Sequence, residues 1–256
     1  MRVFGLDSVL YTLGFFAKTL GGVGSFVFRG KAAYKILLMQ ILFTFVEALG
    51  IASMLALGIG AAVYLIGMPL LASLSQERLL YTLLIVIVTR ELGPLLASFI
   101  IIARSATAIA TEIGGMVVSH EVEAYISIGV DPIEYLAAPR FLAVTLSMFL
   151  LNIYFSIFGL AGSFLVVRFF NPMPAEYYFG NLLEALSVYD ILISVVKSVS
   201  FGMIIGVLAI VNGFSVERAS TEIPVVGLKS VGASFAWCII VDVLLSAVYY
   251  TALNRG

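Results

Sequence analysis

The sequence predicts an all-α integral membrane protein with an N-terminal interfacial helix, five transmembrane helices, and a short cytoplasmic helix between spans two and three. Hydrophobic residues make up 62% of the 256 positions and charged residues only 11%, whereas soluble domains carry about 25% charged residues. The apolar residues gather in five runs, and a helix needs about 20 such residues to cross a bilayer. The expected spans are residues 36–68, 79–103, 141–169, 191–211 and 231–252.

Residues 1–35 are expected to form an interfacial amphipathic helix and an elbow, ahead of one five-span domain at 36–256. Apolar residues recur with helical periodicity from Leu6 to Leu20 and leave one polar face. A helix of about 15 residues is too short to span, so we expect it to lie in the membrane surface. A soluble amphipathic helix packed on a partner is the alternative. Glycines 21, 22 and 24 are expected to end this helix, and Pro69 the first span.

The charge distribution predicts the orientation. With the N-terminus inside, the cytoplasmic segments carry 9 Lys and Arg residues, 5 in the N-terminal tail and 2 in each of two connections, whereas the opposite side carries 3. Because cytoplasmic segments are enriched in positive charge, the N-terminus is predicted to be cytoplasmic and the C-terminus external. The net charge of −1 gives no reason to expect a nucleic-acid partner.

Several kinds of chemistry are disfavoured by the residues present. One cysteine, Cys238, excludes an internal disulfide, and one cysteine with one histidine cannot build a zinc site. The nearest approach to an ATP-binding P-loop, from Gly24 to Ala32, has one residue too many between its glycines and lacks the final serine or threonine. The N-terminus shows no cleavable signal peptide. We therefore expect no catalytic residue, metal or bound cofactor in this chain.

The most informative stretch is Thr89-Arg90-Glu91-Leu92-Gly93-Pro94, inside the second span. Arg90 lies 12 residues after Arg78 and 14 before Arg104, which places it roughly 18 to 21 Å from either polar end. A charge at that depth costs on the order of 3 kcal/mol, so it indicates a functional site. Gly93 and Pro94 are expected to kink the helix, because proline clashes with the carbonyl four residues back, that of Arg90.

Two other charges are expected inside the membrane, Lys197 in span four and Asp242 in span five. Together with Arg90 and Glu91 they sum to zero. Neighbouring positions on a helix point about 100° apart, so Arg90 and Glu91 should face different partners, with Asp242 and Lys197 as candidates. The hypothesis is a network that links spans two, four and five. The alternative is that these pairs fix helix register without touching a substrate.

Residues 105–139 are expected to form the longest connection between spans. The pattern predicts a short helix over about 119–128, with Ser119 as its cap and Gly129 at its end, and a new helix start at Asp131-Pro132. Apolar positions that remain in this connection suggest that a partner docks against it.

Five motifs follow one another between residues 90 and 140: Arg90-Glu91-Leu92-Gly93-Pro94, Ala103-Arg104, Glu112-Ile113-Gly114-x-Met116, Gly129-Val130-Asp131-Pro132 and Pro139-Arg140. In this order and spacing they resemble the MlaE/YrbE family of permeases in lipid-transport ABC transporters. The sequence departs from the family at Ala103 and Ala106, where glycines usually flank the arginine, and at His120-Glu121, where Glu-Gln is common. The resemblance is dense over 89–140 and looser elsewhere.

The resemblance implies a homodimeric permease of the bacterial inner membrane that moves phospholipid between the inner and outer membranes. Two cytoplasmic ATPase subunits would hold ATP and Mg²⁺, a periplasmic MCE-domain protein would be a further partner, and a STAS-domain subunit is a candidate. A lipid cavity would lie at the dimer interface. The charges Arg90, Glu91, Lys197 and Asp242 match those of the family. The residues implied for ATPase coupling are Glu112, Gly114, Met116, His120, Glu121, Glu123, Gly129, Asp131 and Pro132.

Three alternatives stay open. A proton-coupled secondary transporter would use Glu91 or Asp242 as its proton carrier and would need no nucleotide. A membrane scaffold would tolerate apolar residues at Arg90 and Glu91. Gly232-Ala233-Ser234-Phe235 is similar to the Gly-x-Ser-x of rhomboid proteases, but a serine nucleophile needs a nearby base, and the one histidine, His120, lies in the polar connection. The direction of transport and the lipid head group are not predicted.

Overall fold

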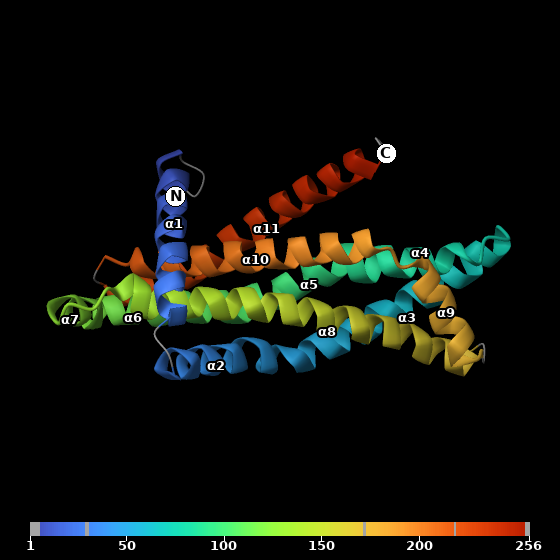
Figure 1. The fold of residues 1–256 in the computed structure, drawn as a ribbon, viewed down its shortest axis with the longest axis horizontal. Helices are drawn as coiled ribbons and strands as arrows, with labels where there is room; N and C mark the ends of the chain where they lie inside the picture. Colours follow the sequence, from blue (N-terminus) through green and yellow to red (C-terminus); the bar gives the residue numbers. More distant parts are fainter. Residues whose placement is uncertain (1–5, 29–30, 171–172, 218, 254–256) are drawn as a thin grey trace. The chain divides into compact units, whose positions relative to one another are not determined.

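The computed structural model describes residues 6–28, 31–170, 173–217 and 219–253. Within these ranges the regular elements are all helices, and five helical stretches are long and apolar enough to cross a membrane (Figure 1). This confirms the all-α, five-span prediction. The five stretches are Leu37–Ser73, Leu79–Val118, Ile133–Phe170, Val188–Phe214 and Ser220–Thr251.

Some spans join several helical segments. The labels η1 and η5 are 3₁₀ turns, whereas η2, η3 and η4 are π-helical segments. In chain order the elements are α1 (Leu6–Phe28), α2 (Lys31–Phe45), η1 (Val46–Ala48), α3 (Leu49–Ser73), α4 (Leu79–Leu84), η2 (Ile85–Glu91), α5 (Leu92–Ile101), η3 (Ile102–Ala106), α6 (Thr107–Val118), α7 (Glu121–Ser127), η4 (Ile133–Ala137), α8 (Ala138–Phe170), α9 (Ala175–Ala185), α10 (Val188–Phe214), η5 (Ser220–Glu222) and α11 (Ile223–Leu253).

The chain divides into two compact units, each assembled from three separate stretches. Unit 1 comprises Met1–Glu47, Ile101–Ser147 and Val199–Val241, and unit 2 comprises Ala48–Ile100, Met148–Ser198 and Asp242–Gly256. The boundary expected near residue 35 stays a prediction.

In unit 1, helix α1 continues through its glycines to Phe28, so the prediction that they end it was wrong. The reason is packing. A Cβ on Gly22 would lie 3.6 Å from the Cα of Glu134 and 3.8 Å from the Cβ of Ala138. Gly22 therefore faces η4 and the start of α8 at a distance where a Cβ would make ordinary van der Waals contact. Packing of α1 against η4 offsets the roughly 1 kcal/mol by which glycine disfavours a helix.

The connection after span two is shorter than predicted. Helix continues through η3 and α6 to Val118, so the connection between spans two and three is confined to 119–132 and contains α7. The short helix α7 is confirmed, but its N-cap is His120, in a left-handed conformation with φ 61°, and not Ser119. Gly129, with φ +78°, ends the turn as predicted, and the next residue, Val130, donates its N–H to the carbonyl of Tyr125 at 3.0 Å.

Unit 2 shows why small residues recur on the first span. Ala52, Ala56 and Gly60 are buried on α3, and a Cβ on Gly60 would fall on the carbonyl oxygen of Gly159 in α8. The two backbones therefore touch, as small-residue faces allow in membrane helices. Helix α3 also passes through Pro69 to Ser73, so the predicted end at Pro69 was wrong. Membrane helices tolerate proline where the freed backbone group finds another partner.

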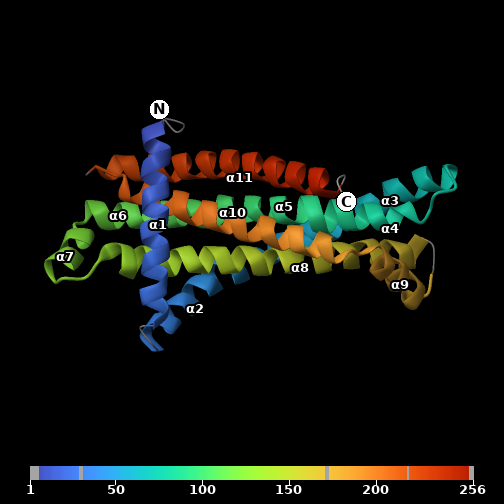
Figure 2. The same cartoon turned by 45° about the horizontal axis from the view of Figure 1, so that its top comes forward.

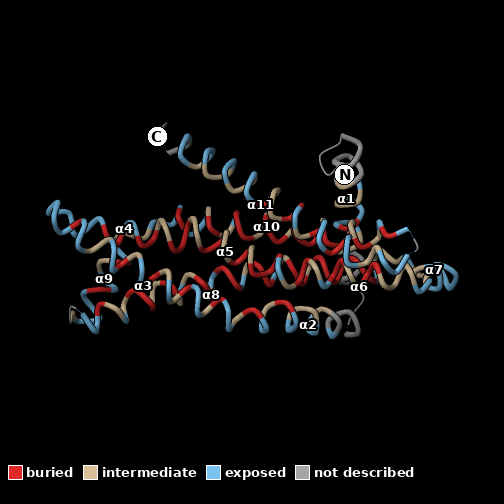
Figure 3. Tube along the Cα trace, turned by 180° about the vertical axis from the view of Figure 1, so that it is seen from behind, coloured by how far each residue is buried: buried red, intermediate tan, exposed pale blue. Residues whose placement is uncertain are grey.

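The end of α3 lies beside α4 (Figure 2), over a core in unit 2 that includes Tyr64, Leu80, Leu84 and Tyr178. Exposed residues follow much of α11 (Figure 3). Apolar exposed side chains on α11, such as Val243 at 61% and Val248 at 64%, are expected for a helix whose solvent is lipid.

Candidate functional site

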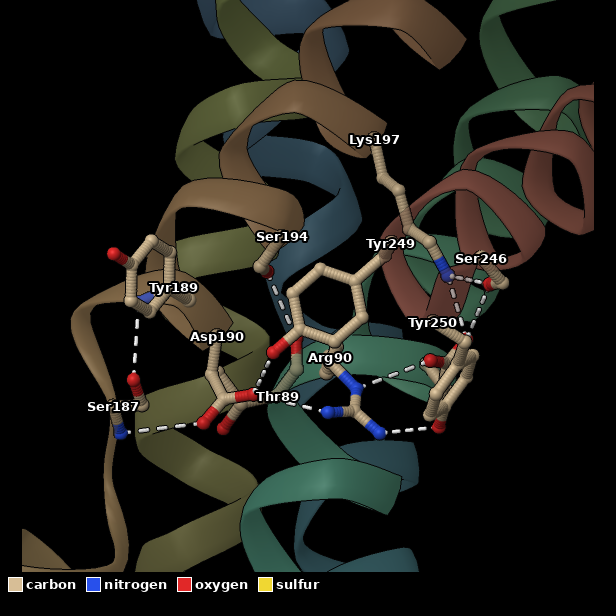
Figure 4. A network of polar contacts seen from close by, with 11 residues as sticks. Thr89, Arg90, Ser187, Tyr189, Asp190, Ser194, Lys197, Ser246, Tyr249 and Tyr250 are labelled. Carbon is tan, nitrogen blue, oxygen red and sulfur yellow. Dashed lines mark hydrogen bonds and ion pairs between the residues drawn. The ribbon is translucent and has the colours of Figure 1, made fainter. Parts of the chain in front are cut away.

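Charged and polar side chains from η2, α10 and α11 meet in unit 2 (Figure 4). We call Arg90, Glu91, Asp190, Lys197 and Asp242 the charge network. Arg90 and Glu91 come from the end of η2, Asp190 and Lys197 from α10, and Asp242 from α11. The structure thus brings together all four intramembrane charges that the sequence singled out, and adds Asp190.

Lys197 is the centre of one half of the network. Its side chain is fully buried, at 0% exposure, and its Nζ lies 2.6 Å from Glu91 Oε2 and 2.9 Å from Asp242 Oδ1. The ammonium also donates to the hydroxyl of Ser246 at 2.8 Å, and that hydroxyl donates to Glu91 Oε2 at 3.1 Å. The expected pairing of Glu91 with Lys197 is therefore found.

Asp242 keeps spare capacity as an acceptor. Its Oδ1 lies within ion-pair distance of the ammonium, but the geometry is not that of a hydrogen bond. Lys197 and Asp242 therefore form an ion pair without a hydrogen bond, because attraction between full charges depends on distance much more than on angle.

Arg90 forms the other half, and its partner differs from the prediction. Its Nη1 donates to Asp190 Oδ1 at 3.1 Å and its Nε to Glu91 Oε1 at 3.2 Å, so Asp190 takes the place expected for Asp242. The guanidinium also donates to the hydroxyl of Tyr250. Its central carbon lies 5.0 Å from the ring centroids of both Tyr249 and Tyr250, a distance at which cations attract aromatic faces.

Sequence reasoning missed Asp190 because span four was expected to begin at Ile191. Helix α10 begins at Val188 instead, and Asp190 is buried at 7% exposure in its first turn. A usable signal was present. Asp190, Ser194 and Lys197 are spaced by four and three residues, which puts them on one face of a helix. On that face Asp190 meets Arg90, Ser194 meets Thr89, and Lys197 meets Glu91.

With Asp190 included, the network holds two cations and three carboxylates, so its formal charge is −1 and not zero. The side chains of Arg90, Asp190 and Lys197 are at most 9% exposed, whereas those of Glu91 and Asp242 are 29% and 16% exposed. The two accessible charges are therefore carboxylates. An approaching ligand would meet acceptor oxygens first, with the cations directly behind them.

Gly93 and Pro94 follow the π-helical segment η2, where the N–H of Leu92 bonds the carbonyl of Ile87, five residues back. In this register the carbonyl opposite residue 94 is that of Thr89, five residues earlier. Proline has no N–H to offer it, and the hydroxyl of Ser194 donates to it at 2.8 Å. The carbonyl of Thr89 therefore has a side-chain donor, and it lies one residue before the carbonyl of Arg90, for which the predicted loss of a partner stays a prediction.

Gly93 is fixed by its surroundings. A Cβ there would lie 2.5 Å from the carbonyl oxygen of Val88 and 3.2 Å from Asn152 Oδ1. Only glycine fits this position without movement of the π-helical turn or of α8. Gly93, Pro94 and Ser194 therefore act together in shaping the backbone that presents Arg90 and Glu91.

The residues implied for ATPase coupling all lie in unit 1, and several hold the unit together. Glu112 Oε1 accepts from Arg140 Nη2 at 2.6 Å, and Arg140 is 5% exposed. Gly114 lies where a Cβ would meet Val216 Cγ2 at 2.9 Å. Met116 lies half-buried on α6.

Other residues of this set lie around α7, in which no residue is buried. His120 and Glu121 are exposed, and His120 Nδ1 lies 3.5 Å from Glu123 Oε1. The apolar side chains of Ile126 and Ile128 are 59% and 72% exposed.

Asp131 and Pro132 begin the helix that follows α7. The carboxylate of Asp131 accepts the N–H of Ile133 at 2.9 Å, which is the predicted cap. The same carboxylate lies 4.0 Å from Lys18 of α1, so it also ties α1 to this end of unit 1.

The rhomboid-like interpretation of Ser234 gains nothing from the structure. Ser234 is fully buried with an unpaired hydroxyl, while the side chain of His120 is 63% exposed and faces Glu123, so the arrangement needed for a serine protease is not formed. Among the described residues, no group of three or more His, Cys, Asp or Glu side chains could hold a metal ion.

The fold and the charge network define a polytopic membrane protein whose spans two, four and five are joined by buried ion pairs. The chain belongs to the MlaE permease family, since the family model for Permease MlaE matches residues 37–248.

Relatives come from bacteria and from a plant. The chain is 27% identical over 245 residues to the intermembrane phospholipid transport system permease protein MlaE of Haemophilus influenzae, covering 93% of this chain and 94% of that protein. It is 29% identical over 194 residues to a probable ABC transporter permease of Rickettsia typhi, covering 73% and 75%. It is also 26% identical over 224 residues to the chloroplastic protein TRIGALACTOSYLDIACYLGLYCEROL 1 of Arabidopsis thaliana, covering 88% and 64%.

Proposed function

We propose that the protein is the membrane permease subunit of an ABC transporter that moves phospholipid between the inner and outer membranes of a bacterial cell. Membership of the MlaE permease family, the name of the Haemophilus relative and the five candidate spans support this proposal. The observation that carries it is the charge network. Buried ion pairs inside membrane spans are costly and indicate a site that handles substrate or drives its movement.

The charge network suits a phospholipid head group. The carboxylate side chains of Glu91 and Asp242 are 29% and 16% exposed, while the more deeply buried Arg90 has aromatic rings against its guanidinium. A head group with an ammonium and a phosphate finds both opposite charges within this arrangement. The apolar faces of α3 and α11, exposed at residues such as Met54 and Val243, suit acyl chains. In a homodimer these faces line a shared lipid cavity.

ATP hydrolysis is assigned to a separate cytoplasmic ATPase dimer, which holds ATP and Mg²⁺. Its docking element is α7, with the exposed side chains of Ile126 and Ile128 as apolar anchors and Glu121 and Glu123 as a charged rim. This requires the N-terminus to be cytoplasmic, as the distribution of Lys and Arg predicts. An MCE-domain protein on the periplasmic side and a STAS-domain subunit complete the proposed assembly.

Nucleotide dependence tests the proposal against a proton-coupled transporter. The complex is purified in mild detergent, its subunits are identified, and it is reconstituted in vesicles that carry a fluorescent phospholipid. Lipid transfer that requires ATP and a co-purified ATPase supports the permease. Transfer driven by a proton gradient without nucleotide would overturn it in favour of a carrier that uses Glu91 or Asp242.

A further inference from the structure

Unit 1 contains a cavity that the charge network does not explain. It has a volume of about 350 Å³ and is lined by residues of α2, η1, η3 and α6. Its polar walls come from Gln40, Thr44, Glu47, Arg104 and Glu112. Its lining also includes Phe43, whose side chain is 59% exposed.

The charges at this cavity are paired but not enclosed. Arg104 donates to the backbone carbonyl of Glu47 and, at 2.5 Å, to Glu47 Oε2, and it has further N–H groups for another acceptor. Both oxygens of Glu112 accept from Arg140, at 2.6 and 3.4 Å. The side chains of Arg104, Glu47 and Glu112 are 35%, 50% and 47% exposed, whereas that of Arg140 is 7% exposed. A ligand in the cavity therefore meets one guanidinium and two carboxylates.

This combination selects a zwitterion that carries an ammonium. A phosphate binds the planar N–H fork of arginine well. Two carboxylates repel a head group of net negative charge and attract an ammonium, which has three N–H donors. Gln40 and Thr44 add neutral acceptors for the remaining N–H groups. A choline head group lacks those donors, so an ethanolamine head group fits better.

The position of the cavity points to a lipid as the source of that head group. Helix α6 ends six residues after Glu112, which is about 9 Å at the rise of an α-helix. Beside the cavity, α2 exposes Leu38, Met39 and Leu42 together with Phe43. A lipid whose head group fills the cavity can therefore lay its acyl chains along α2.

We propose that the cavity between α2 and α6 binds the head group of a zwitterionic phospholipid with a primary ammonium, separately from the charge network. The phosphate pairs with Arg104, the ammonium with Glu47 and Glu112, and the acyl chains follow α2. The inference rests on the proposed function only in taking phospholipid as the ligand class.

Site-specific photo-cross-linking tests this proposal. Phe43 is replaced by p-benzoyl-phenylalanine in the full chain, within its complex, in nanodiscs that hold equal amounts of phosphatidylethanolamine and phosphatidylglycerol. After illumination, mass spectrometry reads the lipid attached to that residue. We expect phosphatidylethanolamine adducts to exceed phosphatidylglycerol adducts about tenfold or more, the ratio that one charge-assisted hydrogen bond supplies. The same probe at Phe169, an exposed residue of unit 2, should report the bilayer composition.

Variants separate the cavity from its surroundings. Arg104→Gln and, as a second variant that keeps the side-chain shape, Glu47→Gln should each bring the ratio at Phe43 close to that at Phe169. Arg78→Gln, at an exposed arginine of unit 2, should leave it unchanged. An unselective ratio in the unmutated cavity, or no change with both cavity variants, would overturn the proposal. Displacement of the adducts by soluble O-phosphoethanolamine would support head-group binding, whereas equal displacement by inorganic phosphate would overturn the selection of an ammonium.

This experiment and the test of the proposed function can fail separately. Lys197→Met should abolish ATP-dependent lipid transfer while the adducts at Phe43 persist. Lipid transfer that needs no ATP, together with selective adducts at Phe43, would overturn the proposed function and leave the cavity proposal standing. ATP-dependent lipid transfer with unselective adducts at Phe43 would overturn the cavity proposal and leave the proposed function standing.

Discussion

Lys197 Nζ lies 2.6 Å from Glu91 Oε2, and it joins α10 to the segment that enters α5 through a fully buried ammonium. The same ammonium lies 2.9 Å from Asp242 of α11. One side chain thus neutralises carboxylates from two other spans. Loss of this cation would leave the carboxylate of Asp242 without its ammonium partner and that of Glu91 with Arg90 alone, which is costlier than removal of both members of a buried ion pair.

Lys197→Met is therefore expected to destabilise the protein by about 3–5 kcal/mol, as when one partner of a buried ion pair is removed. ATP-dependent lipid transfer should also be lost. The double variant Lys197→Met with Asp242→Asn should recover part of the stability, because the carboxylate that pairs with Lys197 is removed together with the ammonium. Thermal unfolding in detergent measures the first effect, and vesicle transfer measures the second.

Lys229→Met is the matched control, because Lys229 is exposed on α11. It should change stability by less than about 0.5 kcal/mol, as ordinary surface substitutions do. Equal effects of the two lysine variants would show that the buried position of Lys197 carries no special cost.

Docking of the ATPase gives a prediction on α7. Ile128→Glu replaces an apolar side chain that is 72% exposed, so the fold should be unaffected. Co-purification of the ATPase should fall about tenfold or more, as at an interface where one anchor side chain supplies 1.4 kcal/mol or more. Leu183→Glu, at a residue of α9 that is 67% exposed, should keep the ATPase bound. Loss of the ATPase with the α9 variant and not with the α7 variant would refute the assignment.

Close backbone contact between α3 and α8 predicts opposite outcomes for two glycines of the same helix. Gly60→Ala would drive a methyl group into the carbonyl of Gly159, whereas a Cβ on Gly58 meets no atom within 4 Å. Gly60→Ala should cost about 1–3 kcal/mol or more, as overpacking does. Gly58→Ala should be neutral or stabilise by up to about 1 kcal/mol through helix propensity. Thermal unfolding measures the stability of both variants. A Gly60→Ala variant as stable as the unmutated protein would rule out the backbone contact between α3 and α8.

Burial of Tyr178, in the short helix α9 between spans three and four, raises the pKa of its hydroxyl to about 12. The ordinary tyrosine pKa is about 10, so the folded state holds the proton more tightly than the unfolded state. The stability that comes from this proton is complete below about pH 10 and is lost as the pH rises toward 12. Tyr178→Phe should flatten that loss in alkaline unfolding curves. An unchanged alkaline slope would contradict the burial of this hydroxyl.

The sequence located the charged residues better than it located the helix ends. The position of a charged residue along an apolar span can be counted in the sequence, so Arg90, Glu91, Lys197 and Asp242 could be identified. Asp190 could not, because its place in the first turn of α10 depends on a partner, Arg90, that lies 100 residues earlier in the chain. The passage of α1 through Gly22 likewise depends on a contact with η4.

The π-helical turn at η2 could not be predicted from the sequence either, because α-helical and π-helical turns are compatible with nearly the same pattern of apolar residues. Proline and glycine signalled an irregularity at 93–94, but they did not say which carbonyl would be freed. That detail came only with the hydrogen bond from Ser194 to Thr89.

This hydrogen bond leads to the sharpest test of the turn that presents Arg90 and Glu91. Ser194→Ala should cost about 1–3 kcal/mol, because it leaves the carbonyl of Thr89 buried without a donor. Pro94→Ala supplies the missing N–H, so the cost of Ser194→Ala should be smaller in that background. A double-mutant cycle on thermal stability measures the difference as a coupling energy, for which contacting residues give about 0.5–3 kcal/mol.

Ser198→Ala is the control for this cycle. Ser198 is equally buried on α10, but its hydroxyl bonds the carbonyl of Val195 in its own helix at 2.9 Å. Its cost should therefore be the same with proline or alanine at position 94. Additive effects of Ser194→Ala and Pro94→Ala would mean that proline does not free the Thr89 carbonyl. The π-helical turn would then owe its shape to Gly93 alone, whose missing Cβ leaves room for the carbonyl of Val88.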